Sequence, residues 1–377
     1  MKRIAIFLDG TTNQLENNTN VWRLKSLCDP LVKDQIVYYC KGVGTAFGEF
    51  IRGRVGGYGI DTEILQAYAW LAQSFEPGDE IFIFGFSRGA YTARSLSGLI
   101  AKCGVLKPGA PLSLEQLYAR YRRHSDRTIH ELMVGTPPRD LEERWIVKYC
   151  EPTNIKMVGV WDTVGSLGSP FAATAKKVTN YMFLDTHLRV QNEFAFHALA
   201  IDEQRKSFEP TLWTRTIDNS ASASPVARPL AQVEQRWFVG AHANVGGGYP
   251  SDVLAQPPLE WLMNKAATLG LQFRNTFVAD GQDPTSPIID SYHDFGYGLV
   301  RLIVPCFNRA IGSEPVKGSA KSTERINETI DGSVFDRWRG NSAYRPAAIQ
   351  SWATLRDVKP EALVGTRLAR DPSVTVP

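Results

Sequence analysis

Residues 80–103 have the sequence EIFIFGFSRGAYTARSLSGLIAKC. The apolar and aromatic run over residues 80–86 predicts a strand buried on both faces, as central strands of parallel sheets are. The run leads through a G-x-S-x-G pattern at residues 85–89 into a segment whose composition predicts a helix over residues 88–103. A strand, a sharp turn that carries a serine and a helix together predict an α/β fold with Ser87 at the end of a central strand.

Ser87 is interpreted as a nucleophile. Gly85 and Gly89 allow the backbone to bend sharply on either side of the serine. The start of the following helix favours negative charge that develops there during a reaction. The alternative is a tight turn in which Ser87 only caps the helix.

Further strands are expected over residues 4–8, 36–40, 155–161 and 234–241, and further helices over residues 61–75 and 192–206. This alternation predicts a doubly wound, mostly parallel sheet like that of α/β-hydrolases. No linker composition divides the chain, so we expect one domain over residues 1–377. Helical insertions that form a cap are expected at about 110–150 and 166–192, and a C-terminal helical and loop extension at about 275–377.

A serine nucleophile needs an imidazole base and a carboxylate that orients it. In α/β-hydrolases these follow the serine in the order acid, histidine, each after a strand. Asp162 follows the predicted strand 155–161, and His242 follows the predicted strand 234–241. His293 is the rival base. Asp202 is the rival acid, although it lies within the predicted helix 192–206.

A purely structural role is expected for His197 and is the alternative for Asp162. His197, on the same predicted helix, is expected to be a packing or hydrogen-bonding residue. Asp162 has the alternative role of capping the next segment, as aspartate often does.

The loop after the first predicted strand contains Asp9, Gly10 and Thr11. Gly10 and Thr11 are expected to supply one N–H group of an oxyanion hole, and Arg88 the other. The alternative is an ordinary turn. No carboxylate spacing supports a metal at Asp9, and no metal or organic cofactor is expected.

The glycine-rich residues 53–59 lack a phosphate-loop pattern and are interpreted as a loop or lid near the site.

Composition excludes several classes of protein. The 377 residues are 43% hydrophobic and 21% charged, which is typical of a globular chain. A net charge of +3 without a strong basic cluster argues against nucleic-acid binding. Five scattered cysteines without a C-x-x-C pattern favour a reducing compartment. No signal peptide or membrane span is expected, so the prediction is a cytoplasmic protein.

Five blocks of sequence resemble the DUF2235 family, the catalytic domain of Tle1-like phospholipase effectors of type VI secretion. They are residues 6–11 (IFLDGT), 85–94 (GFSRGAYTAR), 159–165 (GVWDTVG), 197–203 (HALAIDE) and 237–242 (WFVGAH), and Tyr344-Arg345-Pro346 also fits. The resemblance implies an α/β-hydrolase with Ser87, Asp162 and His242 as its triad, and delivery by a type VI secretion system. The family usually has Asp where this chain has Asn244, and its effectors are often longer.

The resulting hypothesis is a serine hydrolase that cleaves carboxylic esters through an acyl-enzyme, a phospholipase or lipase acting on an ester lipid. Contact with a membrane surface is the associated expectation. The basic residues 120–127 are interpreted as a solvated helix terminus, with a face for anionic lipid headgroups as the alternative. The alternatives are a carboxylesterase for soluble esters and a catalytically silent binding module of the same fold. The sequence makes no prediction of the oligomeric state.

Overall fold

The structure is a computed structural model of the chain. It describes residues 1–10, 18–42, 58–123, 125–165, 188–218, 228–249, 253–275, 286–289, 306–312, 321–355, 357–360 and 373–375. Residues 53–57 of the loop or lid expected at 53–59, and residues 166–187 of the cap expected at about 166–192, lie outside the described residues.

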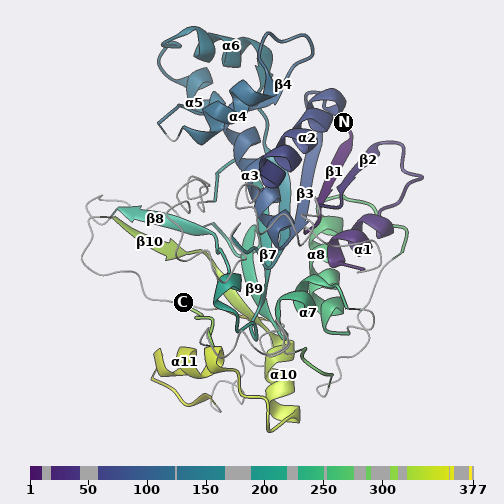
Figure 1. Cartoon of the computed structure of the whole chain (residues 1–377), viewed down its shortest axis with the longest axis vertical. Coiled ribbons are helices and arrows are strands. Elements are labelled where there is room, and N and C mark those ends of the chain that lie inside the picture. The colour runs from purple at the N-terminus through teal and green to yellow at the C-terminus, as the bar shows by residue number, and fades with distance from the viewer. Residues whose placement is uncertain are drawn as a thin grey trace.

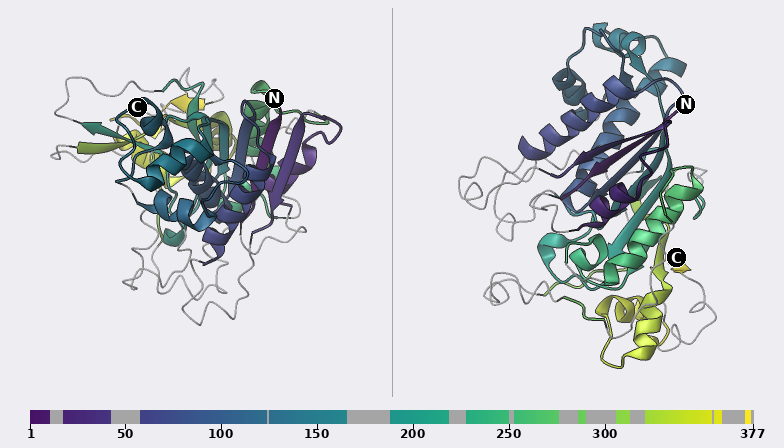
Figure 2. Two further views of the ribbon diagram at one scale, coloured as in Figure 1. Left: turned by 90° about the horizontal axis from the view of Figure 1, so that it is seen from above. Right: turned by 90° about the vertical axis from the view of Figure 1, so that its right-hand side faces the viewer.

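The described residues form one main sheet and two small two-stranded sheets (Figures 1 and 2). The order of the main sheet is β12-β11-β9-β7-β6-β3-β1-β2, in which β12 pairs antiparallel with β11 and every other pairing is parallel. Its strands are β1 (Arg3–Leu8), β2 (Gln35–Cys40), β3 (Glu80–Phe86), β6 (Ile155–Trp161), β7 (Asn192–Ala200), β9 (Val233–Phe238), β11 (Glu328–Asp331) and β12 (Ser373–Thr375).

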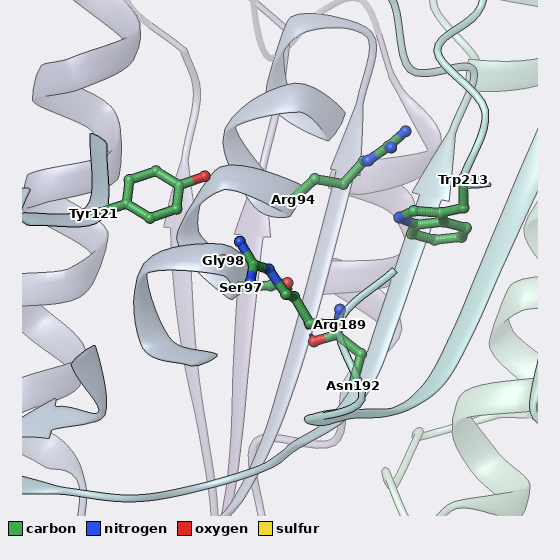
Figure 3. Close-up of a pocket in the computed structure, with 7 residues that line it drawn as sticks. All are labelled: Arg94, Ser97, Gly98, Tyr121, Arg189, Asn192 and Trp213. Carbon is green, nitrogen blue, oxygen red and sulfur yellow. Dashed lines mark hydrogen bonds between the residues drawn. The ribbon is translucent and has the colours of Figure 1, made fainter. Parts of the chain in front are cut away.

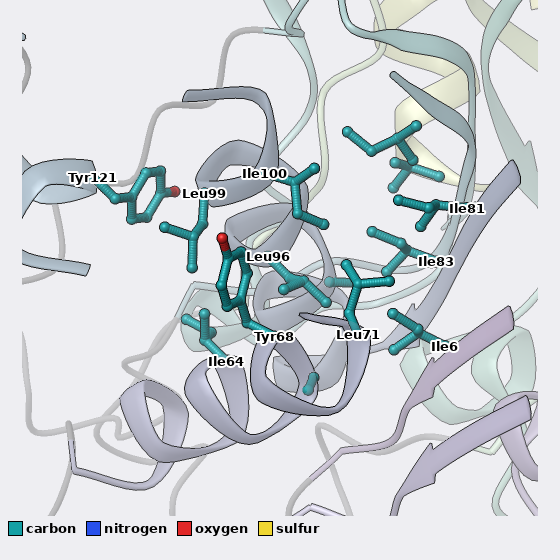
Figure 4. Close-up of a cluster of buried hydrophobic side chains, with 14 of the residues drawn as sticks. Ile6, Ile64, Tyr68, Leu71, Ile81, Ile83, Leu96, Leu99, Ile100 and Tyr121 are labelled. Carbon is teal, nitrogen blue, oxygen red and sulfur yellow. The ribbon is translucent and has the colours of Figure 1, made fainter. Parts of the chain in front are cut away.

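Helices cover both faces of this sheet. Helices α2 (Tyr58–Ser74) and α3 (Arg88–Cys103) pack on one face, where the apolar cluster of Figure 4 includes Ile6, Ile83 and Leu96. Helices α1 (Asn20–Leu27) and α8 (Gln256–Thr268) pack on the other, over a cluster that includes Phe84 and Leu262. The predicted doubly wound, mostly parallel α/β sheet is confirmed.

The winding of the chain reverses next to the central strand β3. The chain runs from β1 outward to β2, returns through α2 to β3 and then continues toward β6 on the other side. Leu8 is in register with Gly85, and Phe86 with Trp161. The loops after these strands therefore share the carboxyl edge of the sheet, where open α/β sheets place their binding sites.

The helix predicted over residues 192–206 is wrong. Residues Asn192–Ala200 form the central strand β7, which pairs with β6 and β9, and a short 3-10 helix (Lys206–Phe208) follows. A strand buried on both faces lacks the polar alternation that distinguishes strands, and its alanines and Leu199 have high helix propensity. Tertiary pairing therefore determined its structure. The strand predicted over residues 234–241 ends earlier, at Phe238.

The insertion at 110–150 is helical but does not lie over Ser87. It contains α4 (Leu114–Arg122), α5 (Ile129–Val134) and α6 (Leu141–Tyr149), and the strands β4 (Val105–Leu106) and β5 (Cys150–Glu151) pair at its base. Helix α3 runs away from the carboxyl edge, and α4 packs beside it, with Tyr121 against Gly98. The insertion therefore lies toward the end of α3 that is away from Ser87, and Figure 1 shows α4, α5 and α6 at the opposite end of the molecule from α10.

The C-terminal region, expected to be a helical and loop extension, contributes strands to the main sheet as well as helices. Strand β11 pairs with β9, and α10 (Gly332–Gly340) and α11 (Ala347–Leu355) follow it. A third apolar cluster joins Trp237 of β9 to Phe335 and Trp352 of these helices. Strand β11 has only four residues of mixed polarity, which is too weak a pattern to predict. Farther out, β8 (Thr214–Asp218) pairs with β10 (Lys321–Arg325).

Candidate active site

Ser87 occupies a strained turn between β3 and α3. Its backbone has φ 59° and ψ −121°, a conformation that is costly for a residue with a side chain. The two flanking glycines make the turn sterically feasible, since a Cβ at Gly85 would lie 2.4 Å from the Gly89 oxygen and one at Gly89 would lie 2.2 Å from the Leu8 oxygen. The turn places Ser87 at the carboxyl edge beside the end of β1.

Ser87, His242 and Asp162 form a continuous hydrogen-bonded chain. His242 Nε2 lies 2.8 Å from Ser87 Oγ, and His242 Nδ1 lies 2.6 Å from Asp162 Oδ2. Asp162 directly follows β6 and has φ 38°, while His242 begins the short helix α7 (His242–Gly246) beyond β9. With its proton on Nδ1, the imidazole can accept the serine proton at Nε2, which is the arrangement that activates a hydroxyl nucleophile.

The surroundings of these residues favour the ionisation states that this chemistry needs. Burial lowers the pKa of His242, and the hydrogen bond to Asp162 opposes that shift only in part. For Asp162, burial would raise the pKa, but the Arg309 charge and the His242 hydrogen bond together hold it well below its usual range. The imidazole is therefore neutral and the carboxylate ionised near neutral pH.

Three further residues surround His242, and the sequence analysis missed all of them. The His242 backbone N–H donates to Glu203 Oε2 at 3.2 Å. The ring of Phe208 meets the imidazole edge to face, with centroids 4.9 Å apart, and the Arg205 guanidinium lies 3.5 Å from the Phe208 ring centre. Glu203 ends the family block at residues 197–203, which was an available signal; no pattern marked the other two.

Glu203 is held in place by Arg205. Two bonds of 2.8 Å join the Arg205 guanidinium to the two oxygens of Glu203. Burial would raise the pKa of Glu203, but the Arg205 hydrogen bond and charge lower it to about 2. The Glu203–Arg205 ion pair is therefore a fixed pair of charges beside His242.

Asp202, the rival acid, and His197 make other contacts. Asp202 Oδ2 accepts the Gly240 N–H at 2.8 Å and the Tyr344 hydroxyl at 3.0 Å, so it connects the loop before His242 to the C-terminal region. His197 lies on β7, and its Nε2 accepts the Thr163 N–H at 3.0 Å. Burial and then the Arg94 charge lower the pKa of His197 to about 3, so it is a neutral hydrogen-bonding residue. His293 lies outside the described residues.

Asn244 stabilises the start of the helix that carries His242. Its Oδ1 accepts the Ala241 N–H at 3.1 Å and the Ile289 N–H at 3.3 Å. An aspartate oxygen could accept the same two bonds, so these contacts do not require an amide at position 244.

The first loop differs from the expected oxyanion hole. The Gly10 N–H donates to Asp9 Oδ1 at 2.8 Å, so it points at a carboxylate. Asp9 Oδ2 also accepts the hydroxyls of Thr19 at 2.5 Å and Tyr39 at 3.1 Å. Thr11 lies outside the described residues, and Arg88 is the first residue of α3.

Among the described residues, the remaining features to consider are a metal site, a pocket and a membrane-spanning helix. Within the described ranges, no group of three or more His, Cys, Asp and Glu side chains is arranged to hold a metal ion. A polar pocket between α3, α4 and the start of β7 has room for about one water molecule (Figure 3). Its lining contains no residue of the Ser87 hydrogen-bonded chain. Among the same residues, no helix has both the length and the apolar character needed to cross a bilayer.

Comparison with known proteins identifies relatives of the chain. The uncharacterized protein YEL023C of Saccharomyces cerevisiae is 28% identical over 233 residues, which cover 56% of this chain and 33% of that protein. The chain thus spans about a third of that relative.

Two solved structures are also similar. An uncharacterized protein from Pseudomonas aeruginosa has a TM-score of 0.43 at 18% identity, covering 72% of this chain and 46% of that one. The Tle1 effector bound to the VgrG spike of the type VI secretion system has a TM-score of 0.35 at 17% identity, covering 66% and 51%.

A family model confirms the resemblance found in the sequence. The family described as "T6SS, Phospholipase effector Tle1-like, catalytic domain" matches residues 2–265, well over half of the chain. The protein therefore belongs to the Tle1-like phospholipase effector family of the type VI secretion system.

Proposed function

We propose that the protein is a serine hydrolase that cleaves carboxylic esters of lipids, with Ser87 as nucleophile, His242 as base and Asp162 as the orienting acid. The observation that carries the proposal is the chain of contacts at 2.8 and 2.6 Å that joins the three side chains at a strained strand-to-helix turn. Membership of a phospholipase effector family supports a lipid ester as the substrate.

The reaction has two halves. In the first, Ser87 Oγ attacks the acyl carbon while its proton passes to His242 Nε2, and the ionised Asp162 stabilises the imidazolium. The ester C–O bond then breaks, and the leaving alcohol takes that proton. In the second half, water loses a proton to His242 and attacks the acyl-enzyme, and the fatty acid leaves as Ser87 regains its proton.

The developing oxyanion needs donors near Ser87. The Arg88 N–H at the start of α3 is one, since the amino end of a helix favours negative charge. Thr11 is the proposed second donor. Gly10 would serve only after its N–H leaves Asp9.

A fluorophosphonate probe tests the nucleophile. We expect the wild-type protein to be labelled and Ser87→Ala to lose both labelling and hydrolysis, with turnover reduced on the order of 10⁶-fold. Ser95→Ala is the matched control, because Ser95 lies on α3 with its hydroxyl bonded to the Tyr91 oxygen at 2.9 Å. If Ser87→Ala keeps its turnover, Ser87 is not the nucleophile. Folded wild-type protein that neither labels nor hydrolyses would identify a binding module.

A substrate panel tests the lipid specificity. Faster turnover of phospholipid vesicles than of short-chain soluble esters is expected of a phospholipase, and the reverse order would identify a carboxylesterase. Vesicle co-sedimentation of Ser87→Ala measures the proposed contact with a membrane surface. Delivery through type VI secretion is a separate proposal, tested by pull-down with a VgrG spike protein.

A further inference from the structure

Arg309 is a fully buried arginine whose guanidinium reaches the carboxylate of Asp162. Its Nη1 donates to Asp162 Oδ1 and its Nη2 to Asp162 Oδ2, at 2.6 and 2.9 Å. The same two nitrogens donate to the backbone oxygens of Ala200 and Phe208, each at 2.6 Å. Arg309 lies beyond residues 2–265, the range that matches the family.

These bonds determine the orientation of the carboxylate. Within the described residues, Asp162 Oδ1 accepts the Ala200 N–H at 3.0 Å in addition to Arg309, and Oδ2 accepts His242 in addition to Arg309. A bidentate pair between arginine and a carboxylate fixes both distance and plane. The bond to the Phe208 oxygen also anchors the residue whose ring packs on His242.

We propose that Arg309 is a positioning residue of the active site, which aims Asp162 Oδ2 at His242 and offsets the negative charge beside the imidazole. This inference rests on the proposed function of Ser87, His242 and Asp162. Arg309 acts through Asp162, because the two side chains share two hydrogen bonds.

The charge of Arg309 should affect protonation of the site. The charged groups around His242 are the anions Asp162 and Glu203 and the cations Arg205 and Arg309. Removal of the Arg309 charge makes a proton on the His242–Asp162 pair more favourable, whichever residue holds it. The acid limb of the pH–rate profile should therefore move to higher pH.

Two substitutions test the inference by ester hydrolysis across pH. Arg309→Met should lower kcat/KM about 100-fold, as a misplaced catalytic group does, mainly through kcat, and move the acid limb to higher pH. Arg309→Lys should be faster than Arg309→Met, because lysine keeps the positive charge but cannot form the two parallel hydrogen bonds of a guanidinium. Arg120→Met is the control, since Arg120 is 1% exposed and lies on α4; it should lower stability without moving the acid limb.

A spectroscopic measurement separates this inference from the proposed function. The proton between His242 Nδ1 and Asp162 should give a downfield NMR resonance in Ser87→Ala, which needs no turnover. Adding Arg309→Met, or Arg309→Lys if the methionine variant does not fold, should shift or remove the resonance.

The outcome of these experiments distinguishes a failure of the positioning role from a failure of the proposed function. An unchanged resonance together with unchanged kcat/KM and acid limb in the Arg309 variants would overturn the positioning role while hydrolysis by Ser87 stands. A resonance that responds to Arg309 in a protein that neither labels nor hydrolyses would support positioning and reject the proposed function.

Discussion

At the scale of single residues, the site concentrates backbone strain. Ser87 and Asp162 both have positive φ angles, 59° and 38°, and neither is a glycine. Each such conformation costs on the order of 1–3 kcal/mol, and it persists because surrounding contacts hold it. Asp162 is held by its N–H bond to the Ala198 oxygen at 2.7 Å and by the Arg309 fork. Both strained residues direct their side chains to His242.

Asp202 should make stability depend on pH. Burial raises its pKa to about 6, opposed by the Gly240 N–H and the Tyr344 hydroxyl. A raised pKa means that the folded state holds the proton more tightly, so this contribution to stability grows as pH falls from about 7 to about 4 and is lost as pH rises through about 6. At pH 8 the ionised carboxylate therefore reduces the free energy of unfolding.

Asp202→Asn should remove this penalty. The amide oxygen can accept both bonds, and the side chain is partly exposed, so we expect a gain of about 1 kcal/mol at pH 8. Thermal unfolding at pH 8 and at pH 4.5 measures it, with a larger rise in Tm at pH 8. Asp202→Ala, which loses both bonds, should be less stable than Asp202→Asn at both values. An equal change in Tm for Asp202→Asn at the two values would show that Asp202 does not titrate in this range.

The sequence predicted Ser87, Asp162 and His242 at strand ends because each follows an apolar run or a clear motif, and the structure brings the three together. Arg309 had no comparable signal. It lies outside any strand or helix that the structure describes, and its role depends on contacts with residues more than a hundred positions earlier. Such a long-range contact cannot be read from local periodicity.

At the scale of elements, α7 lies so close to β3 that a side chain at Gly246 would collide with the sheet. A Cβ there would lie 1.9 Å from the ring of Phe86, and that ring lies 4.7 Å from the imidazole of His242. The absence of a side chain at Gly246 therefore determines how closely the helix that carries His242 approaches Ser87.

Gly246→Ala should disturb both stability and activity. The methyl group forces α7 or Phe86 to move, which costs about 1–3 kcal/mol, and the shift of His242 should lower kcat/KM. Chemical denaturation and ester hydrolysis measure the two effects. Gly165→Ala is the control, because none of the residues that the structure describes lies within 4 Å of a Cβ at that position. Equal stability and activity in the two variants would mean that α7 adjusts freely.

Helices and strands were predictable where the local residue composition favours the same structure as the pairing of strands in the sheet. The strands predicted at 4–8 and 80–86 match β1 and β3 because β-branched and aromatic residues dominate them. Strand β7 was mistaken for a helix because its alanines favour helix locally, while its two neighbouring strands stabilise the extended form. Strand β11 is held by pairing with β9 and β12 and by Ile330 in the third apolar cluster, none of which its local sequence predicts.

At the scale of the whole molecule, the range that matches the family is smaller than the folded unit. Residues 2–265 lack Arg309, β11, α10 and α11. Without them, the third apolar cluster loses its C-terminal members, which include Phe335 and Trp352, and β9 loses its pairing with β11. The free energy of folding should decrease accordingly.

A fragment of residues 1–265 should therefore fail to fold cooperatively and should not hydrolyse esters. Circular dichroism during thermal unfolding and fluorophosphonate labelling test this. A fragment of residues 1–360, which keeps Arg309, β11, α10 and α11 and lacks β12, is the matched comparison and should show a cooperative transition. A cooperative, labelled 1–265 fragment would show that Arg309 and β11 are dispensable.

The order in which the parts of the site occur along the chain has a consequence for protein synthesis. Ser87 leaves the ribosome more than two hundred residues before Arg309, and β11 follows later still. A growing chain therefore carries the serine while Asp162 still lacks its guanidinium clamp. Under the proposed function, hydrolytic competence would then arise only after Arg309 has been synthesised and has bound Asp162.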